Sequence, residues 1–120
     1  MKVDRNARTW CEISLPALRN NLRTLRRCLP PKNKILAVVK DDAYGHGLIP
    51  VGRALAQAGC EEFGVACVSE GVQLRKAGIR QPILLLGSTR LVSVSDTTQS
   101  TSFQSPMDMW NGGTEGGTVR

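Results

Sequence analysis

The sequence predicts an α/β fold in which short parallel strands alternate with single helices. Three short apolar runs support this prediction, at residues 35–39, 62–68 and 82–86, because strands buried on both faces of a parallel sheet are apolar throughout. Single helical segments separate these runs, as in parallel βαβ units. The alternatives are a doubly wound sheet and a (β/α)8 barrel. Since a complete barrel takes about 250 residues, a chain of 120 residues would hold only its opening portion.

The first two predicted elements are a half-buried strand at residues 9–15 and a helix that begins near Pro16. The strand alternates apolar and polar side chains, and proline suits the first turn of a helix. One apolar stripe then follows the helix, because leucines recur at spacings of three and four. These leucines are Leu15, Leu18, Leu22, Leu25 and Leu29. Pro30 and Pro31 end the helix.

The elements that follow continue the alternation. A loop with two glycines is predicted at residues 42–47, ahead of a helix at 48–58. A further helix is predicted at residues 70–77, with Ser69 as its N-cap residue. A glycine follows each of these two helices, as is common at helix ends.

The character of the chain changes after Arg90. Residues 93–105 are rich in serine and threonine, and two Gly-Gly pairs follow them. Such a segment cannot bury enough apolar surface to offset the entropy lost on ordering. We therefore predict a folded unit over residues 1–90 and a mostly disordered tail over residues 91–120. The last predicted strand, at 83–86, would then have no neighbour on its outer side.

Charge and cysteine content limit the classes of function. The formal net charge is +6, which keeps a nucleic-acid-binding module as a weak alternative. Much of the excess lies on the solvent side of the first predicted helix, and no aromatic residue interleaves it for base stacking. These residues are Arg19, Arg23, Arg26 and Arg27.

The four cysteines show no Cys-x-x-Cys spacing, and there is one histidine, so we predict no metal site. No apolar segment follows the charged start, so no secretory signal is predicted. The longest apolar runs are far shorter than the roughly 20 residues of a membrane span. Reduced thiols in such a chain predict a cytoplasmic protein without a membrane partner.

A lysine follows the first buried strand directly. Lys40 stands at the carboxyl end of residues 35–39, and that edge of a parallel sheet is where ligands bind. A neutral lysine amine can form a Schiff base with a carbonyl compound. From position alone, a lysine that extends from the strand end to solvent is the simpler interpretation.

Residues 37–47 read AVVKDDAYGHG. This segment resembles the pyridoxal-phosphate motif of alanine racemases, in which Ala-Tyr-Gly-His-Gly follows a lysine after a gap of two residues. Stretches within residues 9–21 and 64–71, and residues 82–87, also resemble that family. The resemblance therefore covers about residues 8–90, all in order.

The resemblance implies the N-terminal portion of a (β/α)8 TIM-type barrel of pyridoxal-phosphate fold type III, truncated here. It implies that Lys40 binds pyridoxal 5'-phosphate and is the catalytic base on the D-alanine side. Tyr44 would contact the cofactor phosphate. Val38 and Leu86 would line the cofactor pocket, although packing is the expected role of both. For His46 we expect a structural role in the loop, and for the glycines that flank it a positive φ or a close backbone approach.

The implied reaction interconverts L- and D-alanine, and the full-length family is a homodimer. Its second base is a tyrosine of the C-terminal domain, whereas the one tyrosine here is Tyr44. We therefore expect the 120 residues alone to be an inactive fragment. The break near Arg90 indicates a frameshifted or prematurely ended reading frame, or a spliced or chimeric product.

Asp41 departs from the family pattern, in which a small residue usually follows the lysine. A carboxylate there would favour the charged ammonium, unless its side chain points away, as strand alternation indicates. A second alternative is a single-domain pyridoxal-phosphate carrier related to racemases. It is disfavoured because the carrier motif lacks Asp-Ala-Tyr-Gly-His-Gly.

Overall fold

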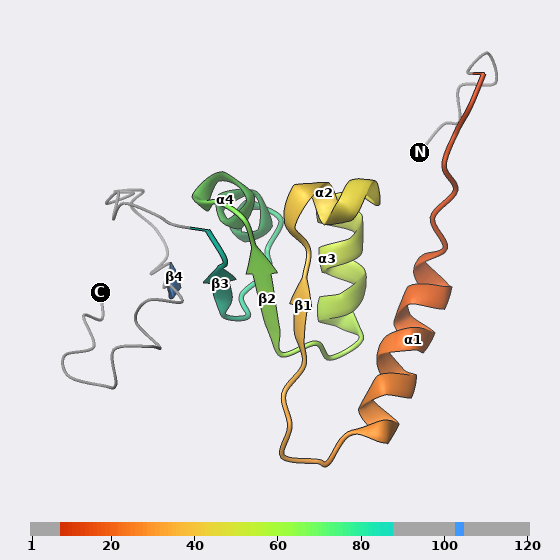
Figure 1. Cartoon of the computed structure of the whole chain (residues 1–120), viewed down its shortest axis with the longest axis vertical. Helices are drawn as coiled ribbons and strands as arrows, with labels where there is room; N and C mark the ends of the chain where they lie inside the picture. The colour runs from red at the N-terminus through yellow and green to blue at the C-terminus, as the bar shows by residue number, and fades with distance from the viewer. Residues whose placement is uncertain (1–7, 88–102, 105–120) are drawn as a thin grey trace.

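A computed structural model describes residues 8–87 and 103–104 of the chain. Within these residues, parallel strands form one sheet in the order β1-β2-β3-β4, with helices between successive strands as far as β3 (Figure 1). The strands are β1 (Leu36–Val38), β2 (Glu62–Val65), β3 (Ile83–Leu85) and β4 (Phe103–Gln104). The three apolar runs predicted as parallel strands are confirmed, with shorter bounds.

Helix α1 (Leu15–Cys28) begins and ends where the sequence predicts. The Ser14 hydroxyl accepts a hydrogen bond from the backbone N–H of Ala17 at 3.3 Å, which caps the helix. Its apolar stripe buries Leu22 against the core, and the helix packs on α3 (Figure 1). The proline pair lies beyond its end, so the helix stops at residue 28.

The strand predicted at residues 9–15 is wrong. Residues 9–14 form neither helix nor strand, Leu15 already belongs to α1, and Trp10 is exposed. In the described part of the chain, β1 is the edge of the sheet on that side. A strand is stable only when a neighbour satisfies its backbone groups, and residues 9–14 have no such neighbour.

Helix α3 (Leu48–Gln57) matches its prediction, whereas α4 (Val68–Lys76) begins earlier than predicted. Cys67, not Ser69, is the N-cap residue, and its backbone is extended. Ser69 lies within the helix, where its hydroxyl is 3.0 Å from the Cys67 sulfur. Val68 packs against the core, so burial of this side chain explains why the helix starts before the serine.

The segment after β1 is a short helix, α2 (Lys40–Gly45), and not the loop predicted at residues 42–47.

Strand β3 has a neighbour on each side, β2 and β4. In its pairing with β4, Phe103 lies opposite Ile83, and Gln104 lies opposite Leu84. The prediction that β3 lacks an outer neighbour is therefore wrong at these two positions. The other predictions for residues 91–120 fall outside the described residues.

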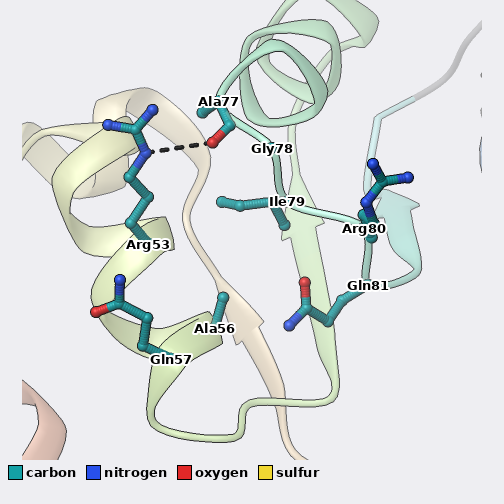
Figure 2. Close-up of a pocket in the computed structure, with 8 residues that line it drawn as sticks. All are labelled: Arg53, Ala56, Gln57, Ala77, Gly78, Ile79, Arg80 and Gln81. Carbon is teal, nitrogen blue, oxygen red and sulfur yellow. Dashed lines mark hydrogen bonds between the residues drawn. The ribbon is translucent and has the colours of Figure 1, made fainter.

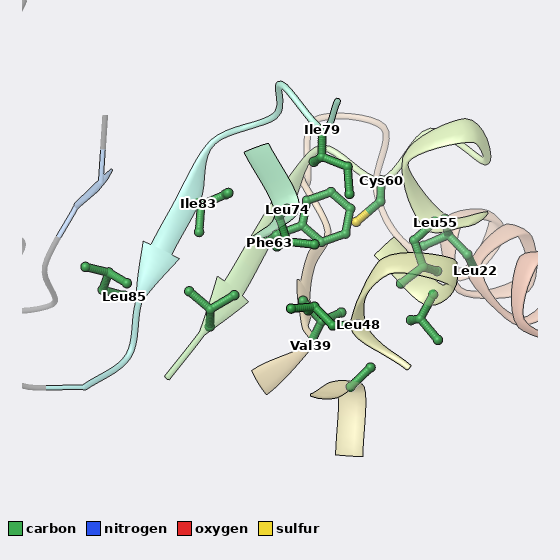
Figure 3. Close-up of a cluster of buried hydrophobic side chains, with 13 residues drawn as sticks. Leu22, Val39, Leu48, Leu55, Cys60, Phe63, Leu74, Ile79, Ile83 and Leu85 are labelled. Carbon is green, nitrogen blue, oxygen red and sulfur yellow. The ribbon is translucent and has the colours of Figure 1, made fainter. Parts of the chain in front are cut away.

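Alternate residues of the strands face opposite sides of the sheet. One side is covered by α3 and α4 and forms the hydrophobic core, where Phe63, Val65, Ile83 and Leu85 are almost fully buried (Figure 3). The other side carries the alternate strand residues, and Val38 on β1 is 38% exposed there. The sheet therefore has a covered face and an open face.

In the described residues, no helix is long and apolar enough to cross a membrane.

Candidate functional site

Lys40 begins α2 at the carboxyl end of β1 and is half-buried. The backbone on its amino side is held by β2, because the Val39 N–H donates to the carbonyl oxygen of Gly64 at 2.8 Å. The Val39 side chain is 1% exposed, within the core. Lys40 is thus the first residue that leaves the packed strand, at the sheet edge where parallel α/β folds bind ligands.

A left-handed helical turn follows the lysine. Residues 41–44 have φ between 53° and 56° and ψ between 38° and 52°. This conformation costs roughly 1–2 kcal/mol for each residue with a Cβ atom, least for aspartate. Gly45 and Gly47 continue with φ of 80° and 92°, so positive φ, one of the two features predicted for these glycines, is present at both. Strained backbone of this kind clusters at functional sites, where the surrounding structure must stabilise it.

Two acidic side chains stabilise this turn. Glu70, in the first turn of α4, accepts hydrogen bonds from the backbone N–H groups of Asp41 at 2.6 Å and Ala66 at 2.8 Å. Asp42 accepts from the N–H of Leu48 at 2.7 Å and so caps α3. Sequence reasoning missed both roles. For Glu70 the available signal was an acidic residue at the start of a helix that follows a neighbouring strand.

His46 closes the turn. Its Nδ1 lies 2.9 Å from the carbonyl oxygen of Ala43 and 3.1 Å from that of Tyr44. Because carbonyl oxygens only accept hydrogen bonds, Nδ1 must carry the proton. These contacts fit the structural role expected for this histidine. Asp41 belongs to the turn and is exposed, so strand alternation does not set the direction of its side chain.

An apolar patch lies on the open face next to the carboxyl end of β1. Leu36, Val38 and Leu86 converge over Gly64, whose missing Cβ would lie 3.0, 3.4 and 3.3 Å from their respective methyl carbons. Glycine makes this convergence possible because a side chain at position 64 would occupy the same space. Leu86 is 40% exposed, so the patch is accessible.

The structure therefore places the four predicted site residues at one edge of the sheet. Val38 and Leu86 meet over the same glycine, while Lys40 and Tyr44 are the first and fifth residues of α2. Tyr44 is 59% exposed, which leaves its hydroxyl free to meet a ligand. An amine, a phenol and an apolar patch are together suited to a flat, partly anionic molecule that carries a carbonyl group.

A separate hollow of about 640 Å³ lies between α3 and the segment that joins α4 to β3 (Figure 2). Its lining contains none of the four predicted site residues. Arg53, which borders it, donates from Nε to the carbonyl oxygen of Ala77 at 3.2 Å. That bond ties α3 to the end of α4, which indicates a structural role for the arginine.

The shifted ionisable groups lie towards the amino ends of the strands. A hydrogen bond from the Ile35 N–H at 3.0 Å, with help from Arg26, lowers the pKa of Glu61. Burial raises the pKa of the Cys60 thiol, and burial also lowers the pKa of Arg75. Arg26, one of the arginines that led us to consider nucleic-acid binding, thus pairs with Glu61, the residue that precedes β2.

No cluster of three or more potential metal ligands occurs within residues 8–87 and 103–104. The four cysteines are free thiols.

The protein-family model described as the alanine racemase N-terminal domain matches residues 13–103 of this chain. The chain belongs to this family. The match confirms the resemblance read from the lysine motif, and it extends 13 residues beyond Arg90. It also decides between the two sheet types: the parallel strands are the N-terminal part of a TIM barrel, not a doubly wound sheet.

Individual alanine racemases of bacteria support the same assignment. The chain is 52% identical to an alanine racemase of Nostoc sp. over 82 residues, which are 68% of this chain and 21% of that protein. It is 53% identical to alanine racemase 2 of Bacillus subtilis over 85 residues, 71% of this chain and 22% of that one. The chain therefore spans about a fifth of the length of these racemases.

Solved alanine racemases have the same local fold. The enzyme from Bacillus anthracis with bound L-Ala-P matches with a TM-score of 0.61 and 41% identity, over 62% of this chain and 19% of that one. The enzyme of Clostridium difficile 630 matches with a TM-score of 0.66 and 42% identity, over 71% and 22%. The racemase fold is therefore shared by the region that contains Lys40 and its turn.

Proposed function

We propose that these residues form the cofactor-lysine portion of an alanine racemase, in which Lys40 holds pyridoxal 5'-phosphate and moves the α-proton of alanine on the D-alanine side. The observation that carries this proposal is the position of Lys40. It stands where a packed strand becomes a strained left-handed turn, beside an accessible apolar patch.

The residues present fit the cofactor. When bound, pyridoxal phosphate supplies an electron sink that stabilises the carbanion left by proton removal. The Lys40 amine is the group that reacts with an aldehyde. Val38 and Leu86 offer apolar contact to a flat ring, and the exposed Tyr44 hydroxyl offers a hydrogen bond to phosphate. We assign these four residues to cofactor binding.

Lys40 has a second task in this proposal, which is to hold or release a proton at Nζ. It is half-buried at the sheet edge, and its backbone is fixed on both sides, through Val39 and Asp41. A group that must reach one carbon atom on one side benefits from such a fixed origin. The rigid strand and the clamped turn therefore suit a general base.

Racemization needs a base on each side of the planar carbanion, and by the family resemblance the second is a tyrosine. The sequence holds one tyrosine, Tyr44, which we assign to the phosphate. We therefore propose that the 120 residues by themselves bind the cofactor weakly and do not racemize alanine. Loss of one acid–base partner costs about 10²- to 10⁴-fold in rate. Further residues of the racemase, and its dimer partner, would supply the rest.

The four free thiols support a reducing compartment for this protein. On that ground we propose a cytoplasmic location, where free alanine would be the substrate.

Cofactor capture at Lys40 tests the proposal. The purified chain is mixed with pyridoxal 5'-phosphate, reduced with borohydride, digested and analysed by mass spectrometry. We expect the pyridoxyl group on Lys40, and its loss in Lys40→Ala. Lys34→Ala is the matched control, because Lys34 lies near the amino end of β1 and pairs with Glu62 at 3.1 Å. Equal labelling of all lysines would contradict the proposal.

Activity is tested separately by following the optical rotation of L-alanine with the chain and cofactor. We expect the rate of free cofactor, with or without the Lys40→Ala change. A Lys40-dependent loss of rotation well above that background would show that the 120 residues contain a second base.

A further inference from the structure

Glu70 connects three elements at the carboxyl edge of the sheet. It belongs to the first turn of α4, and its two carboxylate oxygens have different partners. Oε1 accepts from the N–H of Asp41 at 2.6 Å, and Oε2 accepts from the N–H of Ala66 at 2.8 Å. Asp41 follows Lys40 directly, and Ala66 follows β2. One side chain thus spans the gap between the lysine turn and the neighbouring strand.

We propose that Glu70 is a positioning residue for Lys40, and that its carboxylate sets the direction in which the lysine side chain leaves the backbone. This inference rests on the proposed role of Lys40 as the cofactor lysine. It adds a residue that touches neither the cofactor nor the substrate and acts through the backbone of its neighbour.

The geometry of the peptide bond explains how the effect reaches the lysine. The peptide unit between Lys40 and Asp41 is planar, so the Asp41 N–H and the Cα of Lys40 lie in one rigid group. The peptide plane on the other side of Lys40 contains the Val39 carbonyl oxygen, which accepts a hydrogen bond from the Ala43 N–H at 2.9 Å. A carboxylate that grips the Asp41 N–H therefore holds the second peptide plane at the Lys40 Cα. With both planes held, the origin of the side chain is defined.

The turn also needs this support. Residues 41–44 are left-handed, a conformation that residues with a Cβ atom avoid. Hydrogen bonds to an ionised acceptor are shorter and stronger than neutral ones. Negative charge is moreover favoured in the first turn of α4. An ionised Glu70 is therefore suited to hold strained backbone that would otherwise relax and move the lysine.

Glu61 offers a matched control at the opposite end of β1. Its carboxylate also accepts from a backbone N–H, that of Ile35 at 3.0 Å, and pairs with Arg26. The chemistry is the same, a glutamate that holds the backbone of a neighbouring segment, but it acts at the amino end of the strand. Loss of Glu61 should therefore affect folding without affecting the direction of Lys40.

The test compares Glu70→Ala, Glu70→Gln and Glu61→Gln in the whole chain, each first checked for folding by far-ultraviolet circular dichroism. Lys40 is labelled by pyridoxal 5'-phosphate with borohydride and, without cofactor, by trinitrobenzenesulfonate over a range of pH. Lys34 in the same digest is the internal reference. We expect Glu70→Ala to lower cofactor capture at Lys40 on the order of 10- to 100-fold, as lost positioning does elsewhere.

Glu70→Gln should be intermediate, because an NH2 group, which only donates, replaces one of the two oxygens that accept from Asp41 and Ala66. Glu61→Gln should match the unaltered chain at Lys40. Glu70→Ala should also change the pH profile of trinitrobenzenesulfonate labelling at Lys40 but not at Lys34, and speed amide exchange at Asp41 and Ala66. Neither of these last two measurements requires cofactor.

The outcomes separate the two proposals. If the unaltered chain does not capture cofactor at Lys40, the proposed function is wrong, and the cofactor-free pH profile and amide exchange still decide the role of Glu70. If cofactor is captured and folded Glu70→Ala matches the unaltered chain in capture and pH profile, Glu70 does not position the lysine. Equal losses in folded Glu70→Gln and folded Glu61→Gln would likewise overturn the proposal, because they would show that the effect on Lys40 does not depend on which end of β1 the glutamate holds.

Discussion

The two faces of the sheet are built from alternate residues of the same short strands, yet they have opposite properties. On the covered face Phe63 and Val65 are 0% exposed beneath α3 and α4. On the open face Val38 and Leu86 are more than a third exposed, next to the lysine turn. The covered face supplies the packing that holds the strands in register, and the open face presents the site. In a barrel the open face is the interior.

Gly64 marks the point where the two faces differ most. Its neighbours along β2, Phe63 and Val65, send large side chains into the core. Gly64 itself has no side chain, and three apolar side chains from β1 and the end of β3 lie over it. A strand position without a side chain often marks a place where another group approaches closely. The comparison therefore predicts that substitutions on the covered face cost stability and those on the open face affect binding.

The largest effect is expected for Phe63→Ala. Removal of this fully buried ring leaves a cavity between the sheet and α4, which costs about 3–5 kcal/mol. For a unit this small, that cost removes most or all of its stability. Urea unfolding followed by circular dichroism measures it. A cost below about 1 kcal/mol would show that the covered face is not the core.

A matched pair of valines tests the two faces directly. Val65→Thr buries a hydroxyl in the core and should cost about 1–3 kcal/mol, because Val65 is 0% exposed. Val38→Thr makes the same chemical change on the open face, where the hydroxyl can reach water, and should change the free energy of unfolding by less than about 0.5 kcal/mol. Cofactor capture at Lys40 should instead be lowered more by Val38→Thr than by Val65→Thr. Equal unfolding midpoints for the two variants would break the comparison.

Cysteine reactivity gives a milder contrast. Cys60 is 2% exposed in the core, and burial raises the pKa of its thiol above the usual value of 9.0. Cys67, at the start of α4, is exposed. Because the thiolate is the reactive form, iodoacetamide should label Cys67 before Cys60 at pH 8. Similar labelling rates of Cys60 and Cys67 in the folded chain would contradict the burial of Cys60.

The raised pKa of the Cys60 thiol also makes stability depend on pH. Since folding raises this pKa, the protonated thiol stabilises the fold below pH 9, and that stabilisation is lost as the pH rises further.

The smallest effect is expected from acid. The Ile35 N–H and Arg26 lower the pKa of Glu61 below its usual 4.5. A carboxyl with a lowered folded pKa contributes stability that is present above the unfolded pKa and is lost as the pH falls through the folded pKa. The urea concentration at the unfolding midpoint should therefore decrease as the pH is lowered below 4.5, and this decrease should be smaller in Glu61→Gln. An unchanged acid profile in that variant would show that other carboxyl groups govern it.

Local patterns in the sequence determined most of the fold. The leucine spacing of α1, the apolar runs of β1 to β3 and the glycine after α3 each depend on neighbours within a few residues. The same holds for the site residues: a lysine at a strand end and two glycines with positive φ can be read from a short stretch. The place of Lys40 at the end of a strand could therefore be predicted without any structure, whereas its assignment to the cofactor came from the resemblance of residues 37–47 to a family motif.

Contacts between distant segments were decided only by the tertiary structure. Residues 9–14 have a strand pattern but no neighbour to pair with, whereas Phe103 lies in a serine-rich stretch and pairs with Ile83. The N–H of Asp41, the first residue of the left-handed turn, is bonded to Glu70, which is 29 residues away in the chain. A hydrogen-bond partner is set by which elements meet in space, and alternation, spacing and composition carry no information about that meeting.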